Sequence, residues 1–184
     1  MVQMSKVGII RPRVNHSAKL RLFCFPYAGG GSSIFHRWPE QLPSAVEVCS
    51  IQLPGRESRI RTPSFRMMGP LIEAVTRSIS PYLDKPFALF GHSLGALVAF
   101  ELARKLETFH GPRPAAFFAS AADAPNTRRS VPILHGLPDD ELMKKLLALY
   151  GTPHEVIQHA EVVQLLLPAI RADLHVFETY TYEP

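Results

Sequence analysis

The chain has few cysteines and lacks any long apolar run. Its 184 residues include only two cysteines, Cys24 and Cys49, and each lies inside a strand-like apolar segment. Disulfide-stapled domains carry more cysteines than this, so we expect both to be buried, reduced thiols. No segment approaches the length of a membrane-spanning helix, and residues 1–17 lack an apolar core long enough for a signal peptide. These absences favour a cytoplasmic protein that does not contact a membrane.

A strong charge imbalance is also absent. The 20 basic and 16 acidic residues leave a net charge of +4, and the basic residues are dispersed, which argues against nucleic-acid binding. The glycine-rich stretch YAGGGSS at residues 27–33 has no lysine after the glycines and no G-x-G-x-x-G pattern, so we expect no nucleotide site. We expect neither a cofactor nor a metal. With 46% hydrophobic residues the chain can bury one good core, which predicts a single domain.

The most informative stretch is PFALFGHSLGALVAFELA at residues 86–103. A short apolar run predicts a buried strand, GHSLG is a G-x-S-x-G turn, and the apolar residues that follow recur at helical spacing. Strand, turn and helix in this order predict a nucleophile elbow, with Ser93 as the projecting nucleophile. Side chains at positions 91 and 95 would collide with the neighbouring strand and helix, which explains the two glycines. The plain alternative is an ordinary Gly/Ser turn.

The first 126 residues alternate between strands and helices. Strands are predicted at residues 20–25, 46–51 and 115–122, the last of them buried, and helices at residues 34–41 and 67–83. This alternation predicts an α/β fold with a mostly parallel sheet and right-handed crossovers. A polar leader at residues 1–18 precedes this core, which we place at residues 19–126.

Composition changes after residue 126. A polar linker is followed by helices, of which one opens at Asp139, a second follows a capping box at residues 152–155, and a third must kink or restart at Pro168. Apolar-faced helices inserted after a sheet strand suit a lid over an acyl pocket, here at residues 127–180. Ordinary helical packing is the alternative.

Two loops are candidates to complete the site. The glycine-rich loop follows a strand, and the backbone N–H of Ala28 can join that of Leu94 as an oxyanion hole when Ser93 attacks a carbonyl. The second loop, QLPGRESRIRTPSF at residues 52–65, places three arginines close together. These arginines are either solvated surface charges or contacts for an acidic partner or a phosphate. They are Arg56, Arg59 and Arg61.

Four motifs in the same order resemble the type II thioesterases. They are FPYAGGG at residues 25–31, LPGRESR at 53–59, GHSLGA at 91–96 and IRADL at 170–174. This family comprises the free-standing editing enzymes of polyketide and nonribosomal peptide synthesis, and the medium-chain fatty-acyl thioesterase is similar. The resemblance implies an α/β-hydrolase fold with a helical lid, and hydrolysis of acyl groups on the phosphopantetheine arm of acyl or peptidyl carrier proteins. Because carrier proteins are acidic, it also gives the arginine cluster a partner.

A serine nucleophile needs an acid and a base, which in this fold follow in the order Ser, acid, His. In the family both follow strands beyond the lid, and residues 181–184 would only begin that part of the core, so neither has a counterpart here. The resemblance therefore predicts the N-terminal portion of a thioesterase that lacks the last strands and helices. We expect an impaired monomeric enzyme with an exposed sheet edge that risks aggregation or strand pairing.

Residues within the chain are weak substitutes for these partners. Asp123 ends the strand after the elbow helix, an acid position used by related thioesterase domains, although a solvent-facing turn aspartate is the alternative. His92 adjoins Ser93, but neighbouring elbow residues point in different directions. Five further histidines are predicted to be surface or packing residues: His110, His135, His154, His159 and His175, with His159 and His175 the least unsuitable. Two other functions stay open, a different esterase of this fold and a carrier-binding module without hydrolysis.

Overall fold

The computed structural model describes residues 7–127, 132–150 and 160–184. A five-stranded sheet with the order β1-β3-β2-β4-β5 forms its centre. The strands are β1 (Gly8–Ile10), β2 (Leu20–Phe25), β3 (Val46–Gln52), β4 (Phe87–His92) and β5 (Ala116–Ser120). Strands β2 to β5 pair in parallel, and β1 runs antiparallel to β3. The predicted α/β fold with a mostly parallel sheet is confirmed.

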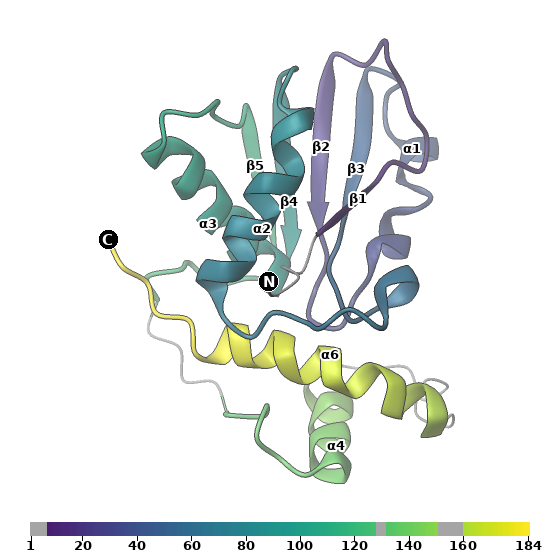
Figure 1. Ribbon diagram of the computed structural model, residues 1–184, viewed down its shortest axis with the longest axis vertical. Helices are drawn as coiled ribbons and strands as arrows, with labels where there is room; N and C mark the ends of the chain where they lie inside the picture. Colours follow the sequence, from purple (N-terminus) through teal and green to yellow (C-terminus); the bar gives the residue numbers. More distant parts are fainter. Residues whose placement is uncertain (1–6, 128–131, 151–159) are drawn as a thin grey trace, which may run out of the picture.

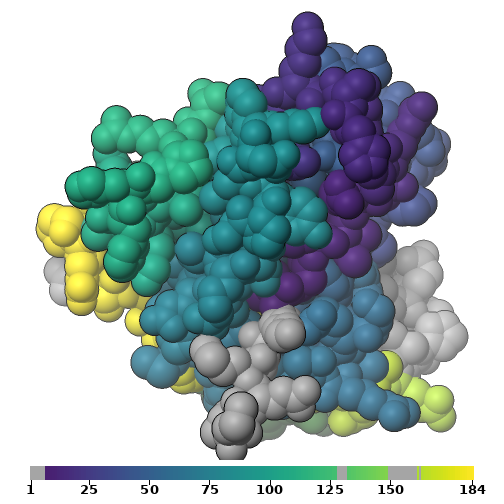
Figure 2. All heavy atoms as spheres, turned by 45° about the horizontal axis from the view of Figure 1, so that its top comes forward, coloured from purple at the N-terminus to yellow at the C-terminus, as the bar shows by residue number. Residues whose placement is uncertain are grey.

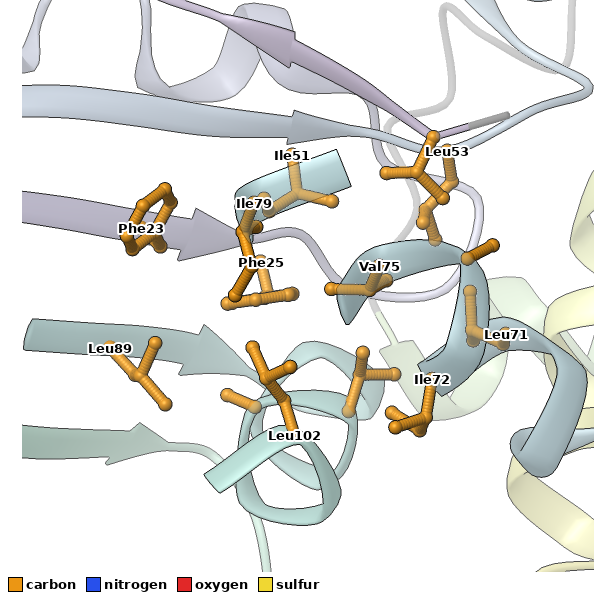
Figure 3. Packing of buried hydrophobic residues seen from close by; sticks show 14 of the residues in the cluster. Phe23, Phe25, Ile51, Leu53, Leu71, Ile72, Val75, Ile79, Leu89 and Leu102 are labelled. Carbon is orange, nitrogen blue, oxygen red and sulfur yellow. The ribbon is translucent and has the colours of Figure 1, made fainter. Parts of the chain in front are cut away.

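Helices cover both faces of the sheet. On one face lie α2 (Met68–Ile79) and α3 (Leu94–Thr108), side by side, and on the other lie α1 (Trp38–Gln41) and the 3-10 turn η1 (Ser32–Phe35) (Figure 1). Two further 3-10 turns are η2 (Glu57–Arg59) and η3 (Ser80–Tyr82). Alternation along β2 explains the two layers, because Phe23 and Phe25 join the cluster under α2 and α3 (Figure 3), whereas Cys24 joins the opposite cluster.

The last helices form a separate layer. Helix α6 (Ala160–Glu178) lies across the carboxyl ends of the strands, with α4 (Asp139–Tyr150) packed beneath it (Figure 1). A leucine cluster joins the two helices, with Leu134, Leu142, Leu146, Leu167 and Leu174 buried in it. Helix α6 continues through Pro168, so of the two predicted alternatives, a kink or a restart, the restart is wrong and the kink stays a prediction. Loss of one intrahelical hydrogen bond is offset by the burial of the neighbouring residues Leu167 and Ala169. The capping box predicted at residues 152–155 lies outside the described residues.

The described part of the N-terminal segment belongs to the sheet core. Gly8–Ile10 form β1, and Val7 is buried in the main cluster, where its carbonyl accepts a hydrogen bond of 2.8 Å from the Ser78 hydroxyl. Figure 2 shows this N-terminal segment packed against the chain around α2. Residues 7–10 are thus part of the core and not of a polar leader. The prediction missed them because a short apolar strand at the edge of a sheet gives only a weak sequence pattern.

The two cysteines are free and buried, as expected. Burial raises the pKa of both thiols, that of Cys49 to about 12. No helix in the described ranges is both long and apolar enough to cross a membrane.

Strand β5 differs from its prediction. It was expected to be buried, yet Phe117 and Phe118 are 39% and 54% exposed. The strand order explains this, because β5 pairs only with β4 and lies at the edge of the sheet formed by the described residues. An apolar run indicates a strand but does not say what covers it.

Candidate active site

Ser93 lies at the turn between β4 and α3, where the elbow was predicted. Its φ of 54° and ψ of −118° are a conformation that costs a non-glycine residue about 1–3 kcal/mol. The Ser93 N–H donates to the Ser120 carbonyl oxygen at 2.8 Å, and its own carbonyl accepts from the Ala96 N–H at 2.9 Å. Strand β5 on one side and helix α3 on the other therefore hold the strained turn, which carries a half-buried serine.

Both glycines of the G-x-S-x-G turn are required by close backbone contacts. A Cβ atom at Gly91 would lie 2.4 Å from the Ala96 backbone nitrogen, and one at Gly95 would lie 2.2 Å from the Phe25 carbonyl oxygen. Rotating a side chain relieves neither contact, so a larger residue would push the backbone apart. The expected collisions are present, and Gly95 brings the elbow against the end of β2.

The glycine-rich loop starts at that end of β2. Gly29 has a φ of 79°, and the Gly30 N–H donates to the Tyr27 carbonyl oxygen at 2.9 Å, which makes a tight turn around Ala28. Within the described residues, the N–H groups of Ala28 and Leu94 have no hydrogen-bond acceptor. Leu94 is the first residue of α3, where a helix leaves its N–H groups unpaired and favours negative charge. Both amides are therefore available to an oxygen anion.

Side chains of β3 and the loop after it form hydrogen bonds with the glycine-rich loop. Gln52 accepts a hydrogen bond of 2.9 Å from the Ser32 N–H, and Glu57 accepts one of 3.1 Å from the Ser33 N–H. The hydroxyls of both serines also donate to the Glu57 carboxylate. Burial alone would raise the pKa of Glu57, but the hydrogen bonds from Ser33 and Ser32 outweigh it and lower the pKa. An ionised carboxylate therefore fixes the backbone beside the predicted oxyanion hole.

Arg56 also forms hydrogen bonds with the glycine-rich loop and is not available to a partner. Its side chain is 1% exposed and forms two hydrogen bonds, of 2.6 and 2.8 Å, with the Asp173 carboxylate of α6. It also donates to the carbonyl oxygens of Gly30 and Pro54. The expected contact between Arg56 and a carrier protein is therefore wrong, since the buried ion pair with Asp173 uses the guanidinium group.

The other two arginines of the cluster occupy different environments. Arg59 is half-buried, and its buried Nε has no acceptor among the residues that the structure describes. Arg61 is exposed and lines a cavity of about 660 Å3 between this loop and α6, which Arg66 and Arg171 also line. A second cavity of about 640 Å3 lies between α2, α3 and the end of α6. Ser93 lines neither cavity, so neither alone marks the place of the reaction.

Asp123 and His92 are not in contact with the Ser93 hydroxyl. Asp123 is exposed beyond the end of β5, and its side chain forms no hydrogen bond or ion pair with another described residue. The His92 Nδ1 lies 2.9 Å from the Ser120 hydroxyl, and its ring packs edge-on against Tyr27. His92 therefore links the elbow to β5.

Of the five other candidate histidines, the three that the structure describes lie elsewhere. His135 Nδ1 is 2.5 Å from Glu178, and His175 Nδ1 is 2.8 Å from the Arg66 carbonyl oxygen. His110 is an exposed residue with a φ of 55° after the end of α3. His154 and His159 lie outside the described residues. No described histidine forms a hydrogen bond with Ser93, and no cluster of metal-ligating side chains occurs in the described ranges.

Comparisons with known proteins identify the family of the chain. Residues 20–184 match the thioesterase domain family. The gramicidin S biosynthesis protein GrsT of Aneurinibacillus migulanus is 44% identical over 174 residues, which cover 95% of this chain and 68% of that protein. The human medium-chain S-acyl fatty acid synthase thioesterase is 37% identical over 174 residues, with 91% of this chain and 64% of that protein covered.

Solved structures show the same relationship. The thioesterase RedJ of the prodiginine pathway in Streptomyces coelicolor aligns with a TM-score of 0.85 and 40% identity, covering 91% of this chain and 66% of that one. The type II thioesterase BorB of the borrelidin cluster aligns with a TM-score of 0.86 and 36% identity, covering 96% and 71%. The α/β-hydrolase fold is thereby confirmed, and this chain spans about two thirds of the length of these proteins. By sequence and by fold, the chain belongs to the thioesterase family.

Proposed function

We propose that this chain hydrolyses acyl thioesters on the phosphopantetheine arm of acyl or peptidyl carrier proteins, with Ser93 as the nucleophile. We further propose that it acts as a monomer in the cytoplasm. The observation that carries the proposal is the strained backbone of Ser93. The backbone also packs closely at Gly91 and Gly95, the two glycines on either side of Ser93. A serine at positive φ at the start of a helix is the geometry that an elbow nucleophile requires.

The reaction follows from the groups around the elbow. The Ser93 hydroxyl passes its proton to water, because no described histidine is hydrogen-bonded to it, and its oxygen attacks the thioester carbonyl carbon, so that negative charge forms on the carbonyl oxygen. The N–H groups of Ala28 and Leu94 stabilise this charge, and removing one oxyanion-hole donor costs about 2.7–4 kcal/mol in a serine protease. Collapse breaks the carbon–sulfur bond, and the pantetheine thiolate takes that proton back from water and leaves as the thiol. Water then attacks the acyl–Ser93 ester, releases the carboxylic acid and restores the hydroxyl.

One observation favours a second function, binding of acyl carrier proteins without hydrolysis. None of the described histidines contacts Ser93, so the described residues include no assigned proton acceptor. Oxyanion stabilisation and binding without the base leave only about 10³–10⁴-fold acceleration over water in the serine proteases. A chain with that constellation would retain the binding surface while releasing thiol slowly.

Thiol release distinguishes the two functions. The purified chain is incubated with an acyl-phosphopantetheine carrier protein, and a chromogenic thiol reagent follows hydrolysis for the wild type, Ser93→Ala and the control Ser80→Ala. Ser80 is an exposed serine at the end of α2. Hydrolysis that Ser80→Ala retains and Ser93→Ala loses supports the proposal, whereas equal rates in both variants would remove Ser93 from the reaction. Carrier binding without thiol release would support the second function, and preference for a simple ester of the same acyl group would indicate an esterase.

Arg61 is the exposed member of the predicted arginine cluster, and we propose that it contacts the acidic carrier protein, with Arg59 beside it. Replacement Arg61→Glu is expected to weaken turnover of the carrier-bound thioester, because like charges then face each other across the contact. Turnover of a free acyl-pantetheine thioester is expected to stay unchanged. Equal losses on both substrates would show that Arg61 acts on the site itself.

A further inference from the structure

Helix α6 reaches the glycine-rich loop through a single carboxylate. The Asp173 Oδ2 accepts the Gly29 N–H at 2.7 Å and the Arg56 Nη1 at 2.6 Å, while its Oδ1 accepts the Arg56 Nη2 at 2.8 Å. Asp173 and Arg56 are 4% and 1% exposed, so water does not replace these bonds easily. The same carboxylate therefore holds the residue next to Ala28 and the arginine that binds the Gly30 carbonyl.

A second contact joins α6 to the same glycine. A Cβ atom at Gly29 would lie 2.7 Å from the Ile170 side chain, one turn before Asp173. Ile170 also packs against the leucine cluster that joins α4 to α6. The helical layer therefore touches the glycine-rich loop through one apolar and one charged side chain on the same face of α6.

We propose that Asp173 and Arg56 are positioning residues, which set the Ala28 amide of the oxyanion hole only when α6 is docked. This inference rests on the proposed function, because it assigns a role within the same site. The Gly29 N–H lies in the Ala28–Gly29 peptide plane, so fixing it fixes that plane, which meets the plane of the Ala28 N–H at the Ala28 Cα. The oxyanion hole is thereby coupled to the layer that covers the site.

The charge balance of the pair suits this role. A lone buried carboxylate at the Gly29 N–H, one residue from Ala28, would repel the negative charge that forms on the substrate oxygen. The bidentate Arg56 guanidinium neutralises Asp173, so the loop gains a hydrogen-bond acceptor without an unpaired negative charge. Each member of the pair is therefore needed for the other.

Only a carboxylate can satisfy the three donors around position 173. In the variant Asp173→Asn, one orientation of the amide faces its NH2 group toward the Arg56 Nη2, and the flipped orientation faces it toward the Gly29 N–H and the Arg56 Nη1. Donor meets donor in both. The variant Arg56→Lys keeps the positive charge but loses the bidentate geometry, so it is expected to have a smaller effect.

Glu47 provides a matched control at the other end of the strands. Its carboxylate is 1% exposed and accepts hydrogen bonds from the Asn15 N–H, Arg21 and Arg11, so that, like Asp173, it accepts one backbone N–H and two guanidinium N–H groups, here from two arginines. It lies near the start of β3, opposite Arg21 of β2 and far along the strands from the elbow. Glu47→Gln thus tests the loss of a comparable buried ion pair without touching the glycine-rich loop.

The test measures residue-resolved amide exchange and steady-state hydrolysis of an acyl-pantetheine thioester by the 184-residue chain. Asp173→Asn is expected to speed exchange at Gly29 by about tenfold or more and to lower kcat by about 10–100-fold with little change in KM. Arg56→Lys is expected to fall between this variant and the wild type. Glu47→Gln is expected to lower thermal stability while it leaves Gly29 exchange and kcat per folded molecule unchanged.

Four outcomes are distinguished. Wild-type exchange at Gly29 in Asp173→Asn would overturn it, and equal kcat losses in Asp173→Asn and Glu47→Gln would reduce the pair to a purely structural role. If the wild type hydrolyses nothing, the proposed function fails, whereas the Gly29 exchange rate still decides whether Asp173 holds the loop. If Asp173→Asn does not fold, the same two measurements on Arg56→Lys against Glu47→Gln give the answer.

Discussion

Replacing Gly95 with alanine would place a methyl group between the elbow and the end of β2. The added Cβ would lie 2.2 Å from the Phe25 carbonyl oxygen and 2.6 Å from that of Pro26. Non-bonded heavy atoms rest about 3.5 Å apart, so one backbone segment must retreat by about 1 Å. Because residues 25 and 26 lead directly into the glycine-rich loop, this shift moves Ala28 relative to Leu94.

Two magnitudes follow from that displacement. Overpacking costs about 1–3 kcal/mol, and a contact with backbone belongs at the upper end because no rotamer relieves it. For a domain of this size, about 2–4 °C of melting temperature is lost per kcal/mol, so a fall of about 5–10 °C is expected for Gly95→Ala. A reacting group misplaced by about 1 Å costs about 100-fold in rate. Activity should therefore fall far more than the folded fraction at 25 °C.

The assay pairs thermal unfolding with the rate at which a fluorophosphonate labels Ser93, read by intact mass. Gly69→Ala is the control, because Gly69 lies in α2 and a Cβ there has no neighbour within 4 Å. That variant should gain about 0.5–1 kcal/mol and label at the wild-type rate. If Gly95→Ala melts and labels like the wild type, β2 and the elbow do not meet as described, and the geometric basis of the site is lost.

Three further predictions concern groups outside the elbow. The ionised Glu57 carboxylate stabilises the folded chain, because the pKa of Glu57 is lowered on folding. This contribution is present above the unfolded pKa of about 4.3 and is lost as pH falls through the folded pKa. In urea titrations, Glu57→Gln should therefore be less stable than the wild type at neutral pH and equally stable in acid. Cys24 and Cys49 should resist iodoacetamide at pH 8 until the chain is unfolded, since burial raises the pKa of both thiols; labelling of native protein would contradict their burial. Phe118→Lys should reduce concentration-dependent light scattering at unchanged melting temperature, because it charges an exposed apolar edge; unchanged scattering would show that β5 does not drive association.

The elbow could be predicted from sequence because its signals are local. Strand β2 was placed to the residue, and β4, Ser93 and α3 follow one another within residues 87–108, where hydrophobic period and glycine spacing suffice. The end of β3 and the two glycine collisions were likewise close to expectation. Each of these features depends on residues a few positions apart.

Arg56 shows what the sequence alone could not provide. Three nearby arginines in a loop suggest solvated charge, and only a partner 117 residues away, Asp173 on α6, makes one of them a buried residue. The signal was present in the pairing of the LPGRESR and IRADL motifs, but spacing does not reveal which side chains meet. The predicted burial of β5 was wrong for the same reason. Burial depends on the segments that pack against a strand, and the run AAFFASAA does not indicate which segments these are.

Strand β5 also contributes to the strained elbow, despite being exposed. The Ser120 carbonyl accepts the Ser93 N–H, and the Ser120 hydroxyl lies 2.9 Å from the ring of His92, so two contacts from one edge residue brace consecutive elbow residues. A conformation that costs about 1–3 kcal/mol persists only where its surroundings hold it. Fraying of β5 would release the Ser93 N–H and let the turn relax. Any strand or partner that covers this edge would therefore stabilise the nucleophile's geometry as well as the sheet.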